Sequence, residues 1–90
     1  MNFEWDPKKA HLNLINHEVT FEEAKTIFDD PLYVDFFDPD HSDIECRYLR
    51  FGMSNRHRLL LVSYTERSDT IRIISARLAT RKERKHYEQA

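Results

Sequence analysis

The sequence predicts an α+β protein in which helices cover one face of an antiparallel sheet. Three observations predict it: apolar residues at helical spacing up to residue 28, alternating apolar residues between 33 and 76, and a basic segment after Thr80. Short turns join the strands into a meander of three to four antiparallel strands, and helices grouped before a meander imply this α+β arrangement. The 90 residues suit one small domain, which we expect to span residues 1–90.

The first elements are a short strand and a helix. Aromatic residues alternate with a charged one at the N-terminus, which predicts a strand over residues 2–5 with its aromatic side chains inward. Asp6 and Pro7 predict a helix start, with Asp6 as N-cap and proline at the first helical position. We expect this helix to end near His17 and to bury one apolar face. That face consists of Ala10, Leu14 and Ile15.

A second helix follows at once. Thr20 and Glu23 form a capping box, in which the Thr20 hydroxyl accepts from the Glu23 amide and the Glu23 carboxylate accepts from the Thr20 amide. The helix ends at Asp29-Asp30-Pro31, because the residue before a proline avoids helical geometry. Its apolar positions are Phe21, Ala24, Ile27 and Phe28.

The period then changes to that of strands. Four segments are predicted strands, at 33–37, 46–53, 59–64 and 70–76: the first is rich in aromatic and β-branched residues, and side chains of the second alternate between two faces. Residues typical of turns separate them, at 38–43, 54–57 and 66–69. Thr80 and Glu83 form a second capping box, which predicts a C-terminal helix of basic composition.

The composition excludes several functional classes. Gly52 is the only glycine, which excludes the glycine-rich phosphate loops of Rossmann and P-loop proteins. Cys46 is the only cysteine, which permits neither an internal disulfide nor a cysteine-based zinc site. The five histidines show no metal-ligand spacing, so we expect no metal and no cofactor.

The sequence also predicts a protein without a membrane segment. Its longest apolar run is Leu59–Val62, whereas a membrane span needs about 18 residues. The N-terminus has no basic region followed by an apolar one, as an export signal would. We therefore expect the cytoplasm as its compartment.

Charge is distributed unevenly along the chain. Residues 1–45 contain 3 basic and 12 acidic residues, whereas residues 46–90 contain 11 basic and 4 acidic ones. The two halves either neutralise each other across the fold or leave a basic face for a polyanion. Composition alone leaves both alternatives open.

The basic residues after residue 70 form a candidate site. Arg77 ends a strand just before the helix that Thr80 caps, and Arg81 and Arg84 share a face of that helix. Guanidinium groups match phosphate oxygens in geometry, and a helix N-terminus also favours anions, so this corner is a candidate phosphate site. Spacing alone favours a plainer interpretation, a solvated basic surface paired with the acidic half.

Two sets of segments decide between these interpretations. In the first half of the chain they are Phe3–Ala10, Asn13–His17, Val19–Ala24 and Phe28–Pro31. In the second half they are Tyr64–Arg67, Ile71–Thr80, Arg81–Arg84 and Tyr87–Glu88. Together they resemble the BrnT family over nearly the whole chain. One departure is Glu18, since family members commonly have a glycine at this position after the first helix.

The resemblance implies a function and a partner. BrnT proteins are the toxin half of bacterial type II toxin-antitoxin pairs, with a RelE-like fold and a metal-independent ribonuclease activity that blocks translation. The partner is a BrnA antitoxin, whose ribbon-helix-helix domain dimerises and binds operator DNA. The resemblance therefore implies a heterotetramer of two toxins and an antitoxin dimer, which contacts DNA only through the antitoxin.

The resemblance also suggests roles for particular residues. Arg77, Arg81 and Arg84 are the candidates for stabilising charge on the phosphorane. The candidate proton donors and acceptors are His57, Glu66 and Tyr87. The residues expected to follow the RNA backbone are Arg56, Arg67, Lys82 and Lys85.

A second class of function stays open at this point. The basic face could belong to a non-catalytic module that binds a partner protein, or to an inactive toxin homologue. For either class, we expect an antitoxin to bind an exposed sheet edge or the basic face.

Overall fold

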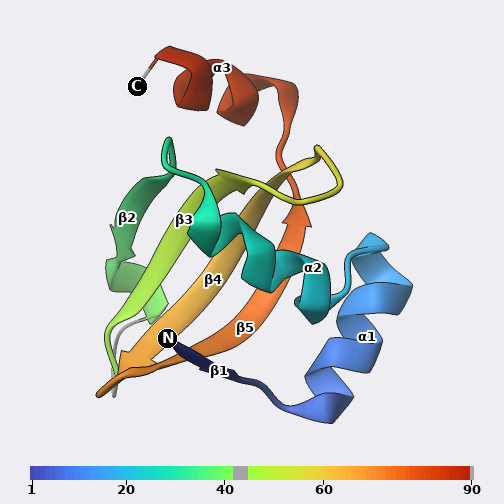
Figure 1. Ribbon diagram of the computed structural model, residues 1–90, viewed down its shortest axis with the longest axis vertical. Helices are drawn as coiled ribbons and strands as arrows, with labels where there is room; N and C mark the ends of the chain where they lie inside the picture. The colour runs from blue at the N-terminus through green and yellow to red at the C-terminus, as the bar shows by residue number, and fades with distance from the viewer. Residues whose placement is uncertain (42–44, 90) are drawn as a thin grey trace.

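Five strands form one mixed sheet with helices packed against it (Figure 1). The computed structural model describes residues 1–41 and 45–89, and it confirms the α+β class. The elements are β1 (Asn2–Glu4), α1 (Pro7–His17), α2 (Phe21–Thr26), the 3-10 turn η1 (Ile27–Asp29), β2 (Val34–Asp38), the 3-10 turn η2 (Pro39–His41), β3 (Arg47–Met53), β4 (Leu59–Arg67), β5 (Thr70–Leu78) and α3 (Arg81–Gln89).

The sheet differs from the expectation in its strand number. Strands β2 to β5 form the predicted antiparallel meander, but β1 adds a fifth strand, parallel to β5, in the order β1-β5-β4-β3-β2. The pairing joins Asn2 to Thr70, so α1, α2 and the strands β2 to β4 lie between the paired segments in the chain. No local pattern indicates so distant a pairing, and the prediction of a three- to four-stranded antiparallel sheet was therefore wrong.

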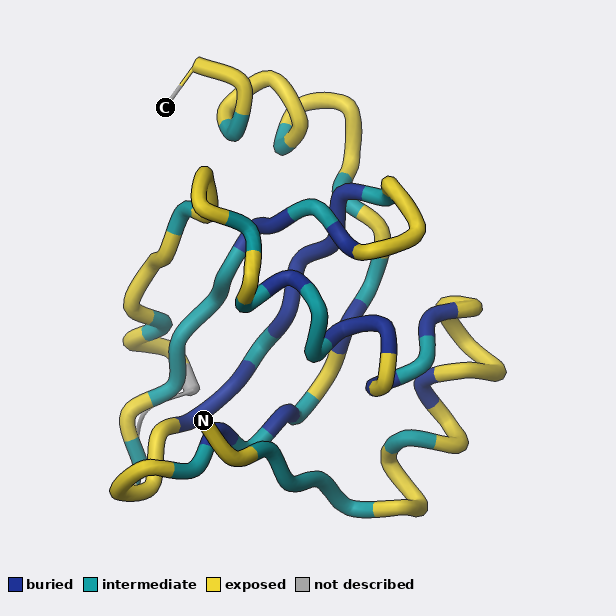
Figure 2. The backbone as a smooth tube through the Cα atoms, in the orientation of Figure 1, coloured by how far each residue is buried: buried dark blue, intermediate teal, exposed yellow. Residues whose placement is uncertain are grey.

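The core lies between the sheet and the first two helices. Helix α2 and η1 lie across one face of the sheet, and α1 lies beside β5 (Figure 1). Most of the buried tube segments in Figure 2 come from α2 and from strands β4 and β5. The buried cluster is formed by Val19, Phe21, Ala24, Ile27, Leu60, Val62, Tyr64, Ile71, Ile73 and Ala76. The aromatic residues of the N-terminal segment add to it, because Phe3 packs edge-on against Phe28 and Trp5 against Phe21.

Helix α1 buries only part of the predicted apolar face, since of its three residues only Ala10 packs against the core. Leu14 and Ile15 are exposed, and the buried residue of this helix is Asn13. The Asn13 amide donates to the carbonyls of Val19 and Ala76, and its oxygen accepts from the Ala76 amide. Helix α1 therefore faces a strand edge, whose unpaired backbone groups need a polar partner rather than an apolar one.

The helix ends are capped largely as expected. Asp6 accepts from the Lys8 amide at the start of α1, where Pro7 is the first helical residue. Glu18 takes the place of the missing glycine with a left-handed φ of 57°, and its amide bonds to the Leu14 carbonyl. The chain thus accepts a backbone conformation that usually favours glycine.

The capping box at α2 is only half formed. The Thr20 hydroxyl accepts from the Glu23 amide, as predicted. The Glu23 carboxylate turns away to Arg58 and to the Ser54 hydroxyl, so the expected bond to the Thr20 amide was wrong. These hydrogen bonds, led by that from Arg58, lower the pKa of the buried Glu23 carboxyl. Glu23 therefore joins α2 to the turn between β3 and β4 rather than closing its own helix.

The single glycine marks a close contact between layers. A Cβ at Gly52 in β3 would lie 2.8 Å from the Cβ of Ile27 and 3.0 Å from its carbonyl oxygen. Glycine is therefore needed here to let η1 approach the sheet, not to supply a turn. In the predicted turn over 38–43, Asp38 is the last residue of β2, residues 39–41 form η2, and residues 42 and 43 lie outside the described residues.

Candidate active site

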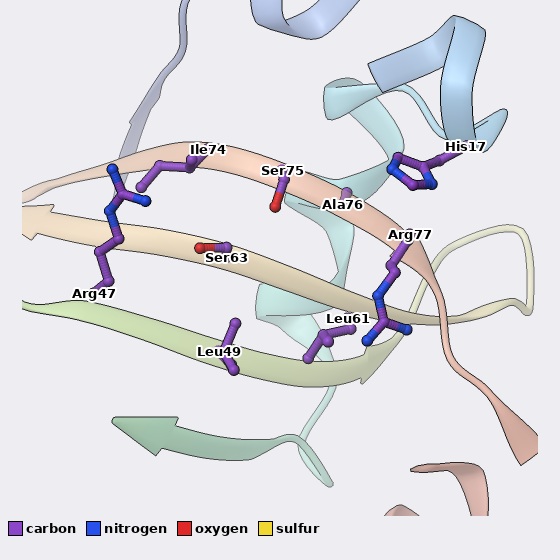
Figure 3. A pocket seen from close by; sticks show the side chains of 9 residues that line it. All are labelled: His17, Arg47, Leu49, Leu61, Ser63, Ile74, Ser75, Ala76 and Arg77. Atoms are coloured by element: carbon purple, nitrogen blue, oxygen red, sulfur yellow. The ribbon is translucent and has the colours of Figure 1, made fainter. Parts of the chain in front are cut away.

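The face of the sheet opposite α2 carries a cavity of about 440 Å³ (Figure 3). Strand register explains which side chains line it: Arg77 pairs with Leu61, and Ser75 with Ser63, which itself pairs with Leu49. Directly paired residues point to the same face, and their neighbours Leu60, Val62 and Ala76 point into the core. The cavity is lined by His17, Arg47, Leu49, Leu61, Ser63, Ile74, Ser75, Ala76 and Arg77.

A bulge in β5 shapes the floor of this cavity. Ser63 pairs with Ser75 and Tyr64 with Ile73, so Ile74 is left over. An extra residue in one strand interrupts the alternation of side chains between the two faces. Ile74 and Ser75 consequently both line the cavity.

His17 reaches the cavity because Asn13 fixes α1 against β5. Asn13 bonds to Ala76, the residue before Arg77, and His17 lies one helical turn after Asn13. Figure 3 shows the His17 ring above the Arg77 end of the cavity, with Arg47 at the other end. A second hollow of about 560 Å³ also contains His17 and Arg77, together with Ile15 and Leu78.

Arg77 is held in a two-pronged ion pair with Glu83. The two guanidinium nitrogens lie 2.8 and 2.9 Å from the carboxylate oxygens. Glu83 also accepts from the Thr80 amide at 2.9 Å, and the Thr80 hydroxyl accepts from the Glu83 amide, which confirms the second capping box. The bonds from Arg77, with those from Thr80, lower the pKa of Glu83 to about 2, and the same contact raises the pKa of Arg77.

Helix α3 is attached to the sheet through one face only. Its contacts are the Arg77–Glu83 pair, the His86 ring against Phe36 with centroids 5.6 Å apart, and a 2.6 Å bond from the Tyr87 hydroxyl to Asp30. Burial, with the bond to Asp30, raises the pKa of Tyr87 to about 12. No residue of α3 is buried, as Figure 2 shows, so polar contacts hold this helix in place.

The other basic residues of α3 lie off that contacting face. Arg81 and Arg84 are exposed, and helical geometry turns them away from the face that carries Glu83, His86 and Tyr87. Lys82 and Lys85 are exposed as well. Among the residues that the structure describes, these four cations form no ion pair, so α3 presents a strip of unneutralised positive charge next to the cavity.

The structure separates the sequence-based candidates for proton transfer. His57 lies in the turn before β4 and Glu66 near the far end of β4, so most of the strand lies between them, at about 3.3 Å per residue. Tyr87 is on α3 and bonded to Asp30. None of the three lines the cavity that contains Arg77.

Two of the residues expected to follow RNA are engaged elsewhere. Arg56 lies 3.5 Å from Glu23 in an ion pair, and Arg67 makes two bonds of 2.7 and 2.6 Å to Glu45. Arg67 is the last residue of β4, at the end of this central strand that lies far from α3 (Figure 1). Lys82 and Lys85 are therefore the members of this set that lie near Arg77.

Over most of the fold, acidic residues of the first half of the chain pair with basic residues of the second half. Basic residues of the second half pair with acids of the first half in the pairs Arg50–Asp35, Arg56–Glu23, Arg58–Glu23, Arg67–Glu4, Arg67–Glu45 and Arg72–Glu4. The exception is α3, whose acid Glu83 binds Arg77 of the same half. Both alternatives derived from composition are thus realised, each in a different part of the molecule.

The cavity combines groups suited to binding a phosphodiester. Arg77 offers a permanent cation with a fork of donors, and His17 offers an imidazole, a side chain that often acts as a general acid or base. Leu49, Leu61 and Ile74 offer an apolar surface for a base, beside the hydroxyls of Ser63 and Ser75. No group of three or more potential metal ligands occurs among the described residues. No helix in that part of the chain is long and apolar enough to cross a membrane.

Sequence reasoning missed several of these residues for a physical reason. His17 was expected only to lie near the end of the first helix, and Arg47, Ser63 and Ser75 were not singled out. The strands that carry them are spaced along the chain and meet only through the sheet register. The available signal was Asn13, a polar residue within an apolar helix face, but its partner Ala76 is 63 residues away in the chain.

Comparison with known proteins identifies the family. A family model for the ribonuclease toxin BrnT of type II toxin-antitoxin systems matches residues 5–83. The crystal structure of the Brucella abortus ribonuclease toxin BrnT has a similar fold, with a TM-score of 0.66, 21% sequence identity, and coverage of 90% of this chain and 99% of that one. A search of curated proteins found no match. The chain belongs to the BrnT family of ribonuclease toxins, which act in type II toxin-antitoxin systems and so imply an antitoxin partner.

Proposed function

We propose that this chain is an endoribonuclease that cleaves RNA in the cavity on the uncovered face of its sheet, without a metal ion. The observation that carries the proposal is that Arg77 and His17 line one cavity, with the exposed cations of α3 beside it. Cleavage of cellular RNA then inhibits translation in the cytoplasm. The family to which the chain belongs supports the reaction class.

The reaction requires three operations on the RNA. A base must remove the proton of a 2′-hydroxyl, cations must stabilise the charge on the phosphorane, and an acid must protonate the leaving 5′-oxygen. Arg77 supplies the cation, and fixed donors of this kind lower a barrier by about 3–4 kcal/mol. His17 moves a proton, since its imidazole lies in the same cavity as Arg77.

The remaining sequence-based candidates have supporting places in this proposal. Arg81 and Arg84 add positive charge near the Arg77 end of the cavity, and Lys82 and Lys85 attract the RNA backbone. Arg56 and Arg67 contact RNA only if it displaces their carboxylate partners. His57, Glu66 and Tyr87 rank after His17 as proton carriers, because they lie outside the cavity.

We further propose the partner and assembly implied by the resemblance. The antitoxin is of the BrnA type, with a ribbon-helix-helix domain, and its dimer binds two copies of this chain. The complex contacts operator DNA through the antitoxin alone. A RelE-like arrangement of a single domain over residues 1–90 is part of the same proposal, supported by the sheet with one covered and one open face.

The test is cleavage of RNA by the purified chain in the presence of EDTA. Wild type is expected to produce defined new 5′ ends, and Arg77→Ala to reduce the rate at least 100-fold through loss of charge stabilisation. His17→Gln is expected to lower the rate, because it removes the proposed proton carrier from the cavity. His11→Gln is the matched control, since His11 is on α1 but does not line the cavity, and its rate stays near that of wild type.

Other outcomes point to the alternatives. If no version cleaves RNA but the antitoxin still binds, the chain is a non-catalytic binding module or an inactive toxin homologue. If cleavage stops in EDTA and returns with a divalent metal, the metal-independent part of the proposal is wrong. If Arg77→Ala cleaves at the wild-type rate, the active site lies elsewhere.

A further inference from the structure

The two edges of the sheet are closed to different degrees. At the β1 side, β5 extends beyond the three residues of β1, and the Asn13 amide satisfies the backbone groups of Ala76 there. At the opposite side, β2 is the last strand, and no other described strand pairs with its outer edge. An unpaired strand edge presents a row of backbone donors and acceptors that another strand can bind.

Exposed apolar side chains surround this open edge. Leu32 is 71% exposed and Phe37 54% exposed, and Tyr33 and Phe36 also remain partly open to solvent. These four residues form the β2 edge patch. Strand β2 itself contains no lysine and no proline, the residues that often protect an edge strand from association. The largest group of exposed apolar residues on neighbouring positions therefore coincides with an unpaired edge.

The charge around the edge indicates what kind of chain binds there. Residues 29–40 contain five aspartates and no lysine or arginine. Asp30 and Asp35 are bonded to Tyr87 and Arg50, whereas Asp29 and Asp40, on either side of β2, are exposed. A second copy of this chain would bring the same acidic segment to the edge, and like charges would repel. A basic partner is therefore favoured over self-association.

A cavity at one end of the edge supports the same partner chemistry. It has a volume of about 450 Å³ and is lined by Leu32, Tyr33, Val34, Tyr87 and Glu88. Apolar walls with one carboxylate suit a lysine or arginine, whose aliphatic stem packs against the walls while its charged end meets the acid. The partner segment thus combines apolar residues with at least one long basic residue.

We propose that the antitoxin docks on this chain by adding an extended segment of apolar and basic residues to β2 as a sixth strand. The inference rests on the proposed function in one respect, the antitoxin partner. It does not depend on catalysis, because the β2 edge patch shares no residue with the cavity that contains Arg77. Five residues of strand offer about 16 Å of edge, enough for a short partner strand.

The test uses the full chain and a full-length antitoxin of the proposed BrnA type. Hydrogen exchange on the complex is expected to show protection of the amides of Val34–Asp38 relative to the free chain. Leu32→Lys and Phe37→Lys are each expected to weaken the affinity at least tenfold, because they replace apolar contact with a charge that repels a basic segment. Leu12→Lys is the matched control, since Leu12 is 56% exposed on α1, and it leaves the affinity within twofold.

The outcomes separate this inference from the proposed function. It is overturned if no complex forms, if the new protection lies away from β2, or if Leu32→Lys binds as wild type does. It is also overturned if the free chain forms a dimer that the edge variants abolish, because the occupant is then a second copy. RNA cleavage by the free variants is measured separately, and wild-type cleavage is expected. If nothing cleaves RNA but the edge is protected in the complex, the catalytic proposal fails and the docking inference stands.

Discussion

Asn13 is a buried polar residue on which the position of the site depends. It is 6% exposed and joins three backbone groups, the carbonyls of Val19 and Ala76 and the amide of Ala76. An apolar residue in its place would improve the hydrophobic pattern of α1. It would also leave these backbone groups without a partner at a place that water reaches poorly. The hydrophobic pattern of α1 thus predicts that an apolar residue in place of Asn13 stabilises the protein, whereas the structure predicts that it destabilises the protein.

Replacement of Asn13 by leucine is expected to destabilise the protein by about 3 kcal/mol, because buried polar groups left unpaired cost about 1–3 kcal/mol each and some recover a water. Urea unfolding followed by circular dichroism measures the change. Ile15→Ala, at a position 61% exposed on the same helix, is expected to change stability by less than about 0.5 kcal/mol. A leucine variant as stable as wild type would contradict the role given to Asn13.

At the scale of elements, the sequence correctly predicted those features that depend only on residues close together in the chain. The caps at Asp6 and Thr80 form as predicted because each involves residues within one helical turn. The Glu23 cap was wrong because Arg58, distant in the chain, competes for the carboxylate. For the same reason β1 could be predicted as a strand but not as part of this sheet.

Helix α3 illustrates an element held by polar contacts rather than by burial. Its first turn is held by Glu83 and its last turn by Tyr87, and none of its residues is buried. Short isolated helices of this length are marginal in water, so these contacts maintain it. The strip of positive charge near the cavity therefore depends on the ionisation of Glu83.

The attachment of α3 is expected to respond to acid in a defined range. The pKa of Glu83 is lowered from 4.5 to about 2, so its contribution to stability is complete above pH 4.5 and is lost as the pH falls towards 2. The amide resonance of Thr80, which donates to Glu83, is expected to titrate with a midpoint near 2 in NMR spectra. Glu83→Gln is the control, in which this titration disappears. A midpoint near 4.5 would show that the ion pair does not form in solution.

At the scale of the whole molecule, the sequence indicated the kind of site but not its location. It singled out Arg77, which does line the cavity, and the basic α3. It could not indicate that His17 and Arg77 meet, because that depends on how α1 docks on the edge of β5. Nor could it show which charges are neutralised, since that depends on pairs such as Arg50 with Asp35 across the sheet.

The ion pair of Arg77 with Glu83 has a consequence for RNA binding. The chain's own carboxylate already occupies the guanidinium that the proposed reaction needs, so a phosphate group binds by exchange of one anion for another. The free energy needed to displace Glu83 from Arg77 then lowers the net affinity for RNA. Release of Glu83 would also loosen the first turn of α3, which brings a change in helix position together with substrate binding.

Removal of the competitor is expected to strengthen binding of a non-cleavable RNA. In fluorescence anisotropy, Glu83→Gln should bind an oligonucleotide with 2′-deoxy sugars several-fold more tightly than wild type. Glu88→Gln removes the same charge from the same helix without freeing Arg77, and it should have a smaller effect. Equal effects of the two variants would mean that net charge alone changes the affinity. If anions bind by exchange, Glu83 keeps weakly bound anions from occupying Arg77. Only ligands that bind Arg77 strongly enough to replace a carboxylate then occupy the site.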